Sequence, residues 1–338
     1  MPDADDTSVA AVSAAVAAVA AATTVRVATE SIESEPASDA VNNRSATMEK
    51  DQSGGWRSKF SVFALIASLF GAGWFAVAAL GSKYGLWDWQ FGLLKMTIGW
   101  GPIVLFGVLG LSVLACVFAL AKAPRKRPFM LALGALLISV LLGGRLFGLG
   151  AGAQSVPPIH DIQTNWDDPI VLSDKLLAAR GPDSNPVLYG DEAVFGDVGR
   201  EEYQSFVGRR IADIQEDAEC DSDAKNACRD SEKPKPFLPI KTLTVAASPD
   251  EVYENALRLV EARGWEVVDA NPLQGRLEAT HTSTWWGFKD DVAIRFRGQE
   301  DGSTRIDMRS VSRVGQSDLG ANARRVTSFL YDLEGQRY

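Results

Sequence analysis

His281 is the residue best suited to acid–base chemistry, since the 338-residue chain holds only two histidines. It lies between Thr280 and Thr282, a few residues before Asp290 and Asp291. A catalytic histidine needs a carboxylate that orients its ring and a nucleophile within reach. Here the carboxylates are close in sequence only, and a hydrogen-bonded strand histidine is the ordinary alternative. The sequence therefore predicts no catalytic residue.

Asp290 and Asp291 invite a second interpretation, because Trp285, Trp286 and Phe288 precede them. Two carboxylates beside an aromatic platform are typical of enzymes that cleave carbohydrates. Adjacent residues of a strand point to opposite faces of the sheet, however, which separates the two carboxylates. We expect a hairpin turn with aromatic side chains packed over the sheet edge.

Arginines give the most suggestive pattern for ligand binding. They alternate with other residues along two neighbouring predicted strands, so we expect them to face outward as a basic ribbon on an acidic protein. The ribbon comprises Arg295, Arg297, Arg305, Arg309 and Arg313. Such a face suits phosphate headgroups or acidic envelope polymers. The alternative is cross-strand pairing with nearby carboxylates. Those carboxylates are Glu266, Asp269, Glu278 and Asp307.

Composition excludes several other functions. A net charge of −9 argues against nucleic-acid binding, which usually requires a basic stripe. Cys116 lies in an apolar run, while Cys220 and Cys228 lie in an acidic stretch too sparse for a zinc motif, and His160 precedes Asp161 in what reads as a turn. No metal and no cofactor is predicted. If this part is exported, Cys220 and Cys228 either form a disulfide or remain two free thiols.

The last hundred residues predict an α+β module. Ser248-Pro-Asp-Glu251 combines an N-cap, a first-turn proline and a capping-box glutamate, and Asp301-Gly302 marks a tight turn. Period-two alternation indicates strands with one buried face. The expected strands are 242–246, 265–269, 276–284, 289–297 and 304–314, with helices over 248–263 and from 317 onward. This order, β-α-β-β-β-β-α, predicts an antiparallel sheet packed on helices, and an acyl-chain cleft between them is a fold analogy.

Several segments also carry a family resemblance. They are Pro157-Pro-Ile-His-Asp-Ile162, Glu278-Ala-Thr280, Trp286-Gly-Phe-Lys-Asp-Asp291, and Arg309-Ser-Val-Ser-Arg313 with Gly315, Ser317-Asp-Leu-Gly320 and Asn322. Over about residues 156–333 the chain resembles the DUF1499 family, with the stretch around Cys220 and Cys228 resembling an insertion. The resemblance implies an envelope setting and a domain that follows membrane helices. It implies no reaction.

Three long apolar runs precede this module, at about 60–80, 96–121 and 129–149. The first two are uncharged, and the third holds Arg145 near its far end. Each has about 20 residues, enough to cross some 30 Å of hydrocarbon as a helix. Trp87 and Trp89 lie at a boundary, as expected for residues of the interfacial belt. Buried core helices of a soluble protein are the alternative, which such long successive runs disfavour. We expect a multi-pass membrane protein of α-helical spans.

Basic residues predict the orientation of these spans. Arg57 and Lys59 precede the first run, and a basic cluster joins the second to the third. That cluster comprises Lys122, Arg125, Lys126 and Arg127. Because positive charge accumulates on the cytoplasmic side, the N-terminus is expected there and the C-terminal domain on the opposite face. In a Gram-negative bacterium this places the protein in the inner (plasma) membrane and the domain in the periplasm.

Small residues within the spans allow close helix contact. Gly71, Gly73, Gly107 and Gly110 have this property, either within one chain or between copies in a homo-oligomer. Because the spans are expected to cross a membrane, lipids are expected partners, together with an envelope protein or polymer.

The remaining segments are polar. Residues 1–55 read as an acidic, Ala-rich disordered tail, with an amphipathic helix over 9–25 as the alternative and Met48 as a candidate start of translation. Residues 151–239 are expected to form a linker and an irregular or helical segment, with an amphipathic helix over 199–217. The sequence as a whole predicts a non-catalytic binding module for a lipid, envelope polymer or protein partner. The alternative is a hydrolase or transferase of the envelope.

Overall fold

The computed structural model describes residues 55–123, 125–189, 193–219, 239–336 and 338. Cys220, Cys228, Met48 and nearly all of the predicted tail lie outside the described residues. Residues 56–338 form one compact unit.

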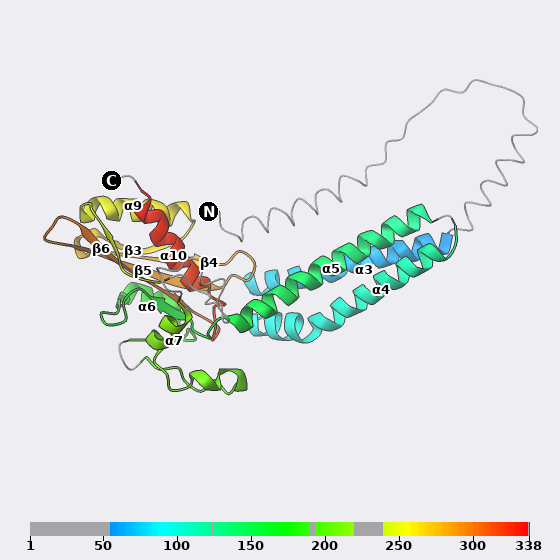
Figure 1. Cartoon of the computed structure of the whole chain (residues 1–338), viewed down its shortest axis with the longest axis horizontal. Coiled ribbons are helices and arrows are strands. Elements are labelled where there is room, and N and C mark those ends of the chain that lie inside the picture. Colours follow the sequence, from blue (N-terminus) through cyan, green and yellow to red (C-terminus); the bar gives the residue numbers. More distant parts are fainter. Residues whose placement is uncertain (1–54, 124, 190–192, 220–238, 337) are drawn as a thin grey trace, which may run out of the picture. The chain divides into compact units, whose positions relative to one another are not determined.

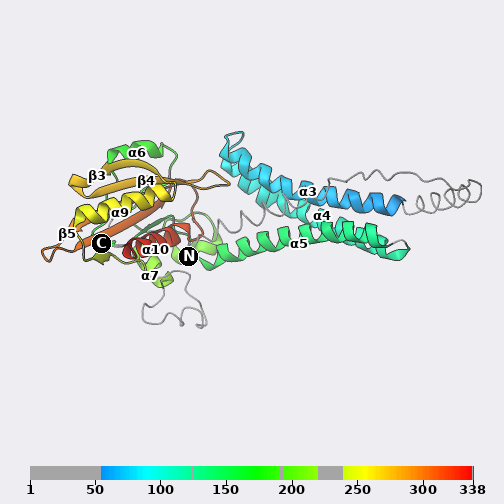
Figure 2. The ribbon, with the colours of Figure 1, turned by 90° about the horizontal axis from the view of Figure 1, so that it is seen from above.

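Long apolar helices make up the first part of this unit. They are α3 (Gly55–Lys83), a π-helical segment η1 (Phe91–Trp100) that continues into α4 (Gly101–Ala121), and α5 (Lys126–Ser155). Pro102 near the start of α4 lacks a backbone N–H, so the usual α-helical bond cannot form at that position. Three helices, 55–83, 91–121 and 126–150, are long and apolar enough to cross a bilayer, which suggests a membrane protein. α3, α4 and α5 run side by side in Figure 1 and Figure 2.

A layer of three serines joins these helices. Ser68, Ser112 and Ser139 are buried, and their hydroxyl oxygens lie 3.1 to 3.4 Å apart. Each hydroxyl also lies within hydrogen-bonding distance of the carbonyl four residues earlier in its own helix. Small polar side chains that meet in this way favour close helix association where water is absent.

The glycines of the spans differ in what surrounds them. A Cβ added at Gly71 would lie 3.2 Å from the side chain of Val108, so Gly71 allows α3 to approach α4. Gly73, Gly107 and Gly110 have nothing within 4 Å of such an atom. Gly71 therefore serves packing within the chain, and the role of the other three in a homo-oligomer stays a prediction.

The C-terminal part is built on a six-stranded sheet in which every strand pairing is antiparallel. The strands are β1 (Asp161–Gln163), β2 (Leu243–Val245), β3 (Glu266–Asn271), β4 (Arg276–Thr282), β5 (Lys289–Gly298) and β6 (Thr304–Ser312). Their order is β1-β6-β5-β4-β3, and β2 also pairs with β6. The predicted α+β architecture is confirmed, and β1 is an addition that the sequence did not indicate.

Two helices cover the apolar face of this sheet. α9 (Pro249–Ala262) has Ser248 as its N-cap, and the Ser248 hydroxyl accepts a hydrogen bond from the Glu251 N–H, as predicted for the N-cap. α10 (Ala321–Glu334) follows β6. Apolar side chains of α9, α10 and the central strands form the main core, which includes Val260, Ile294 and Phe329. The short helix α6 (Asp174–Arg180) lies on the opposite face (Figure 1).

The helix expected over 199–217 is wrong as a single element. Residues 201–206 form a 3-10 helix, η3 (Glu201–Phe206), and α7 (Ile211–Ala218) starts afresh. Between them Gly208 has a φ of +78°, and its N–H donates to the Phe195 carbonyl. The Phe195 N–H in turn donates to the Arg209 carbonyl. This pairing with residues 193–195 competes with helical hydrogen bonding and splits the amphipathic segment.

Candidate functional site

The face of the sheet opposite α9 and α10 is charged rather than apolar. Alternate residues of β5 and β6 share this face, where Arg295 pairs in register with Asp307 and Ala293 with Arg309. Segment 164–189, which contains α6, covers it through contacts with charged side chains. We call this set the ionic layer. It comprises Asp161, Arg180, Asp291, Arg295, Asp307, Arg309 and Arg313.

Arg309 lies at the centre of the ionic layer and is fully buried. Its Nε donates to Oδ1 of Asp161 at 2.9 Å, and its Nη1 donates to the carbonyl of Ile170 at 2.6 Å. Asp161 is also fully buried and accepts from the Leu188 N–H at 3.0 Å. The expectation that Arg309 faces outward is therefore wrong. Strand β1, which carries Asp161, pairs with β6 and brings its carboxylate to the guanidinium.

Asp291 forms the second centre. It is fully buried and accepts from Arg180 at 2.7 Å, from Arg313 at 2.7 Å and from the Thr280 hydroxyl at 2.8 Å. Arg313 also donates to the carbonyl of Ala179, at the end of α6. Two guanidinium groups thus share one carboxylate, which attaches α6 to β5 and β6.

The remaining ribbon arginines are paired but closer to solvent. Arg295 donates to Asp307 at 2.9 Å and to Asp168 at 3.0 Å, Arg297 pairs with Asp168, and Arg305 lies 3.4 Å from Asp307. Burial opposes ionisation of Asp307, but hydrogen bonds from Thr242 and Arg295 outweigh it and lower its pKa. The side chains of Arg297 and Arg305 are 47% and 33% exposed, so they are the ribbon arginines most accessible to a ligand. Ligand binding by the ribbon stays a prediction.

Ser173 attaches the start of α6 to the same face. Its hydroxyl caps the helix by accepting from the Leu176 N–H, and its own N–H donates to the carboxylate of Glu278 at 2.8 Å. Glu278 is fully buried, and burial raises its pKa. Nearby, Asp269 pairs with Lys175 at 2.6 Å and with Arg276 at 2.8 Å. The charged face therefore holds segment 164–189 along its length.

His281 lies beneath α10, where Arg325 controls its surroundings. Nη2 of Arg325 lies 2.6 Å from Oδ2 of Asp290 and 3.0 Å from Nδ1 of His281. Because guanidinium only donates, this contact makes Nδ1 an acceptor and places the proton of neutral His281 on Nε2. The carboxylate of Asp290 is 3.7 Å from Nδ1. Asp290 therefore binds Arg325 and does not orient an Nδ1–H.

The serines beside this cluster are engaged by Asn322. Ser310 Oγ lies 2.7 Å from Oδ1 of Asn322, whose Nδ2 donates to Ser312 Oγ at 2.9 Å and to the His160 carbonyl at 3.0 Å. Within the described part of the chain, no serine hydroxyl hydrogen-bonds to His281. A nucleophile and base are thus not assembled here. Asp290 and Asp291 face opposite sides of the sheet, as the alternation of a strand requires.

The pKa values of two carboxylates near α10 are shifted in opposite directions. Burial opposes ionisation of Asp290, but the positive charge of Arg325, 2.6 Å away, outweighs it and lowers the pKa of Asp290 to about 2. Desolvation raises the pKa of Asp318 to about 6, although its carboxylate accepts from the Gly320 and Asn322 N–H groups. Asp318 therefore stabilises the fold most when protonated. That contribution is present below the usual pKa of 3.8 and is lost as pH rises through 6.

Acid is expected to weaken the fold through Asp290. Its ionised form stabilises the folded state above about pH 4, and this contribution disappears as pH falls toward about 2. The shift from 3.8 to about 2 corresponds to about 2 kcal/mol. Free energies of unfolding measured across this range should fall more steeply for the natural chain than for Asp290→Asn. Parallel curves for the two proteins would contradict the assignment.

Comparison with known proteins identifies the sheet and its helices. A family model described as a protein of unknown function, DUF1499, matches residues 211–333. The C-terminal domain is a DUF1499 domain. No curated protein matches the chain. The matched residues contain Arg309, Arg313 and Asn322, while Asp161 and Arg180, which complete the ionic layer of this DUF1499 domain, precede them.

Three charged partners on this face of the sheet were not anticipated from the sequence. Asp161, Asp168 and Arg180 all precede the family match, and the arginine ribbon was instead expected to pair with other carboxylates, of which only Asp307 is a partner. Asp161 did stand within the motif Pro157-Pro-Ile-His-Asp-Ile162 that resembles the family. That motif was the available signal, because a carboxylate that becomes buried requires a positively charged or hydrogen-bonding partner.

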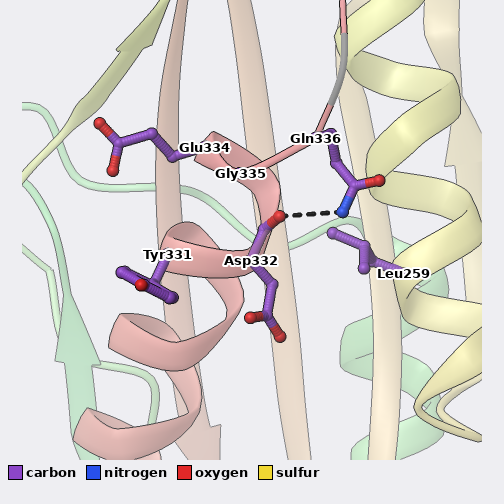
Figure 3. Close-up of a pocket in the computed structure, with 6 residues that line it drawn as sticks. All are labelled: Leu259, Tyr331, Asp332, Glu334, Gly335 and Gln336. Atoms are coloured by element: carbon purple, nitrogen blue, oxygen red, sulfur yellow. Dashed lines mark hydrogen bonds between the residues drawn. The ribbon is translucent and has the colours of Figure 1, made fainter. Parts of the chain in front are cut away.

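The DUF1499 domain carries a shallow pocket at the end of α10 (Figure 3). Its volume is about 410 Å³. It is lined by Leu259, Tyr331, Asp332, Glu334, Gly335 and Gln336. The Gln336 side-chain amide donates to the Asp332 carbonyl, and the Asp332 carboxylate pairs with Arg263 at 2.6 Å. Among the described residues, no group of three or more His, Cys, Asp or Glu side chains could hold a metal.

The tip of the β4–β5 hairpin, residues 283–288, is aromatic. Trp286 stacks on Phe288 with ring centroids 5.8 Å apart, and Trp285 is 39% exposed. The Ser283 hydroxyl accepts from the Phe288 N–H at 2.9 Å, which closes the turn. The hairpin turn expected from the sequence is present, and its aromatic side chains gather at the tip, where Phe288 contacts Trp89.

Proposed function

We propose that the protein spans the inner (plasma) membrane of a bacterial cell and presents its DUF1499 domain on the periplasmic face as a non-catalytic binding module. Its ligand is a component of the envelope: a lipid, a polymer or a protein. Two separate features support this role: the orientation of the membrane helices and the pairing of the domain's charged groups.

Contacts at the two ends of α3 carry the sidedness. Near its start, Arg57 donates to the carbonyls of Lys122 and Ala123, so the beginning of α3 and the α4–α5 connection lie at one end of the helices. Lys83, the last residue of α3, donates instead to the Thr284 carbonyl of the DUF1499 domain at 2.7 Å. The basic residues favour the cytoplasm for the first end. The domain then belongs to the opposite side.

The pairing of charged groups favours binding over turnover. A catalytic site gathers titratable groups around a space where substrate can enter. In the DUF1499 domain, Asp291 and Arg309 are engaged in ion pairs beneath segment 164–189. Nδ1 of His281 is engaged by a hydrogen bond with Arg325. The His281–Asp290 pair is the one feature that favours a hydrolase or transferase. That alternative would require Arg325 to release both residues.

Native mass spectrometry of the detergent-solubilised chain tests the binding role. We expect a copurifying ligand of phospholipid mass. The double variant Arg297→Ser/Arg305→Ser should retain it, because both arginines already pair with carboxylates and lie at the end of β5 and β6 distant from the hairpin tip. A chain that carries no lipid, polymer or protein would contradict the binding role. Loss of the ligand in the double variant would instead assign it to the ribbon.

A further inference from the structure

We propose that the aromatic hairpin tip, residues 283–288, docks on the bilayer that the protein's own helices cross, with Trp285 and Trp286 among the lipid headgroups and carbonyl groups. This inference rests on the proposed binding role and names phospholipid as the partner of that domain. It follows from where the hairpin tip is held and from which side chains it exposes.

The position of the hairpin tip follows from its contacts. Segment 84–90 is short and joins α3 to η1, so it must lie at the membrane boundary if both helices cross the bilayer. Lys83 donates to the Thr284 carbonyl at 2.7 Å, and the rings of Trp89 and Phe288 meet edge to face with centroids 6.0 Å apart. The hairpin tip is therefore held at the level where the chain leaves and re-enters the membrane.

A close backbone contact reinforces this placement. Gly287 has a φ of +70°, and a Cβ built on it would lie 3.1 to 3.4 Å from Lys83. The turn therefore fits against the end of α3 with little room for a side chain. The atoms of Lys83 in this contact include its Cα as well as its side chain, so the turn of the hairpin packs directly against the end of α3.

The exposed chemistry of the hairpin tip fits the interfacial zone of a bilayer. Tryptophan prefers this zone because its ring is apolar while its indole N–H can still reach water or lipid oxygen atoms. Trp285 is 39% exposed, and Trp286 and Phe288 are partly exposed. Lys289 at the base of the hairpin is exposed, and its ammonium group suits a phosphate. A phospholipid surface is thus the partner that satisfies both the rings and the adjacent charge.

Spin-label accessibility in nanodiscs tests this inference on the full chain. Cys116, Cys220 and Cys228 are replaced by serine, and a nitroxide is attached to Trp285→Cys or, separately, to Thr284→Cys. The matched control is Leu273→Cys, a fully exposed position in the turn at the other end of β4. At about 3.4 Å per residue, β4 alone separates the two turns by about 20 Å. The discs contain phosphatidylglycerol and phosphatidylethanolamine.

For each label we compare its collision rate with lipid-soluble oxygen to its collision rate with a water-soluble nickel chelate. This oxygen-to-nickel ratio should be severalfold higher for the labels on the hairpin than for the label at 273. Equal nickel accessibility at 273, 284 and 285 would overturn the inference. Thr284 is exposed, so its variant reports even if loss of the Trp285 ring disturbs the turn. Nanodiscs offer both membrane faces to solvent, so this result does not depend on sidedness. A failure here is thus distinct from a failure of the proposed periplasmic placement or of ligand retention.

Discussion

Replacing Arg309 with methionine is expected to destabilise the DUF1499 domain by about 3–5 kcal/mol, the typical cost of leaving a buried charge without its partner. Arg309 and Asp161 are both fully buried, so Asp161 would keep a negative charge that water cannot reach. The carbonyls of Ile170 and Leu188 would also lose a donor. Pulse proteolysis of the detergent-solubilised chain across a urea series measures this change in the free energy of unfolding.

Arg305→Met is the matched control for this experiment. Its side chain is 33% exposed, and Asp307 keeps Arg295 and Thr242 as partners, so we expect a change below about 1 kcal/mol. The double variant Arg309→Met/Asp161→Leu should recover part of the lost stability, because it removes the unpaired carboxylate as well. Recovery stays incomplete, since backbone groups that the two side chains satisfied remain. A double variant no more stable than Arg309→Met would contradict an ion-pair origin of the effect.

The ionic layer explains residues that resemble the family without assigning them a reaction. Arg309 binds Asp161, Arg313 binds Asp291, and Asn322 links two serines of β6 to the His160 carbonyl. All of these contacts attach the chain between 157 and 189, or the start of α10, to β5 and β6. The DUF1499 domain thus uses its charged face, together with a small apolar cluster of Ile170, Leu172 and Leu176 on Ala293, to hold this segment.

Local patterns in the sequence were sufficient to predict much of the fold. The three apolar runs, the Ser248 N-cap and the period-two strands each depend on residues close together in the chain, and each is present. The helix expected over 199–217 was wrong because its apolar spacing is a local pattern. The hydrogen bond between Phe195 and Gly208 that interrupts the helix joins residues farther apart in the chain, which the local pattern does not reveal.

The candidate site was harder to predict because charged residues carry no signal of burial. Alternation placed Arg309 correctly on one face of β6, yet whether that face meets solvent depends on Asp161, nearly 150 residues earlier in the chain. For the arginine ribbon the sequence left two interpretations open, an accessible binding face or pairing with carboxylates, and in the structure it is largely paired. The aromatic hairpin was predicted from its turn, but its contact with Lys83 required the structure.

The contacts at the two ends of α3 predict that these ends, and the groups bound to them, lie on opposite sides of the membrane. Arg57 joins the connection near Lys122, whereas Lys83 joins the DUF1499 domain, so a reporter in the first place and a reporter on the domain should lie on opposite sides of the membrane. The positive charge near Arg57 and Lys122 favours the cytoplasm for that end. Reversal would require the basic residues near Arg57 and Lys122 to be translocated, against the preference of Lys and Arg in short loops for the cytoplasmic side.

Reporter fusions in a Gram-negative host measure this most directly. Alkaline phosphatase, which is active only after export, is fused after Tyr338, and a second fusion places it in the α4–α5 connection after Lys122. The predicted result is high phosphatase activity for the fusion after Tyr338 and none for the fusion after Lys122, with a cytoplasmic fluorescent reporter giving the reverse pattern. An inactive phosphatase after Tyr338 beside a fluorescent cytoplasmic reporter at the same position would contradict the placement of the domain.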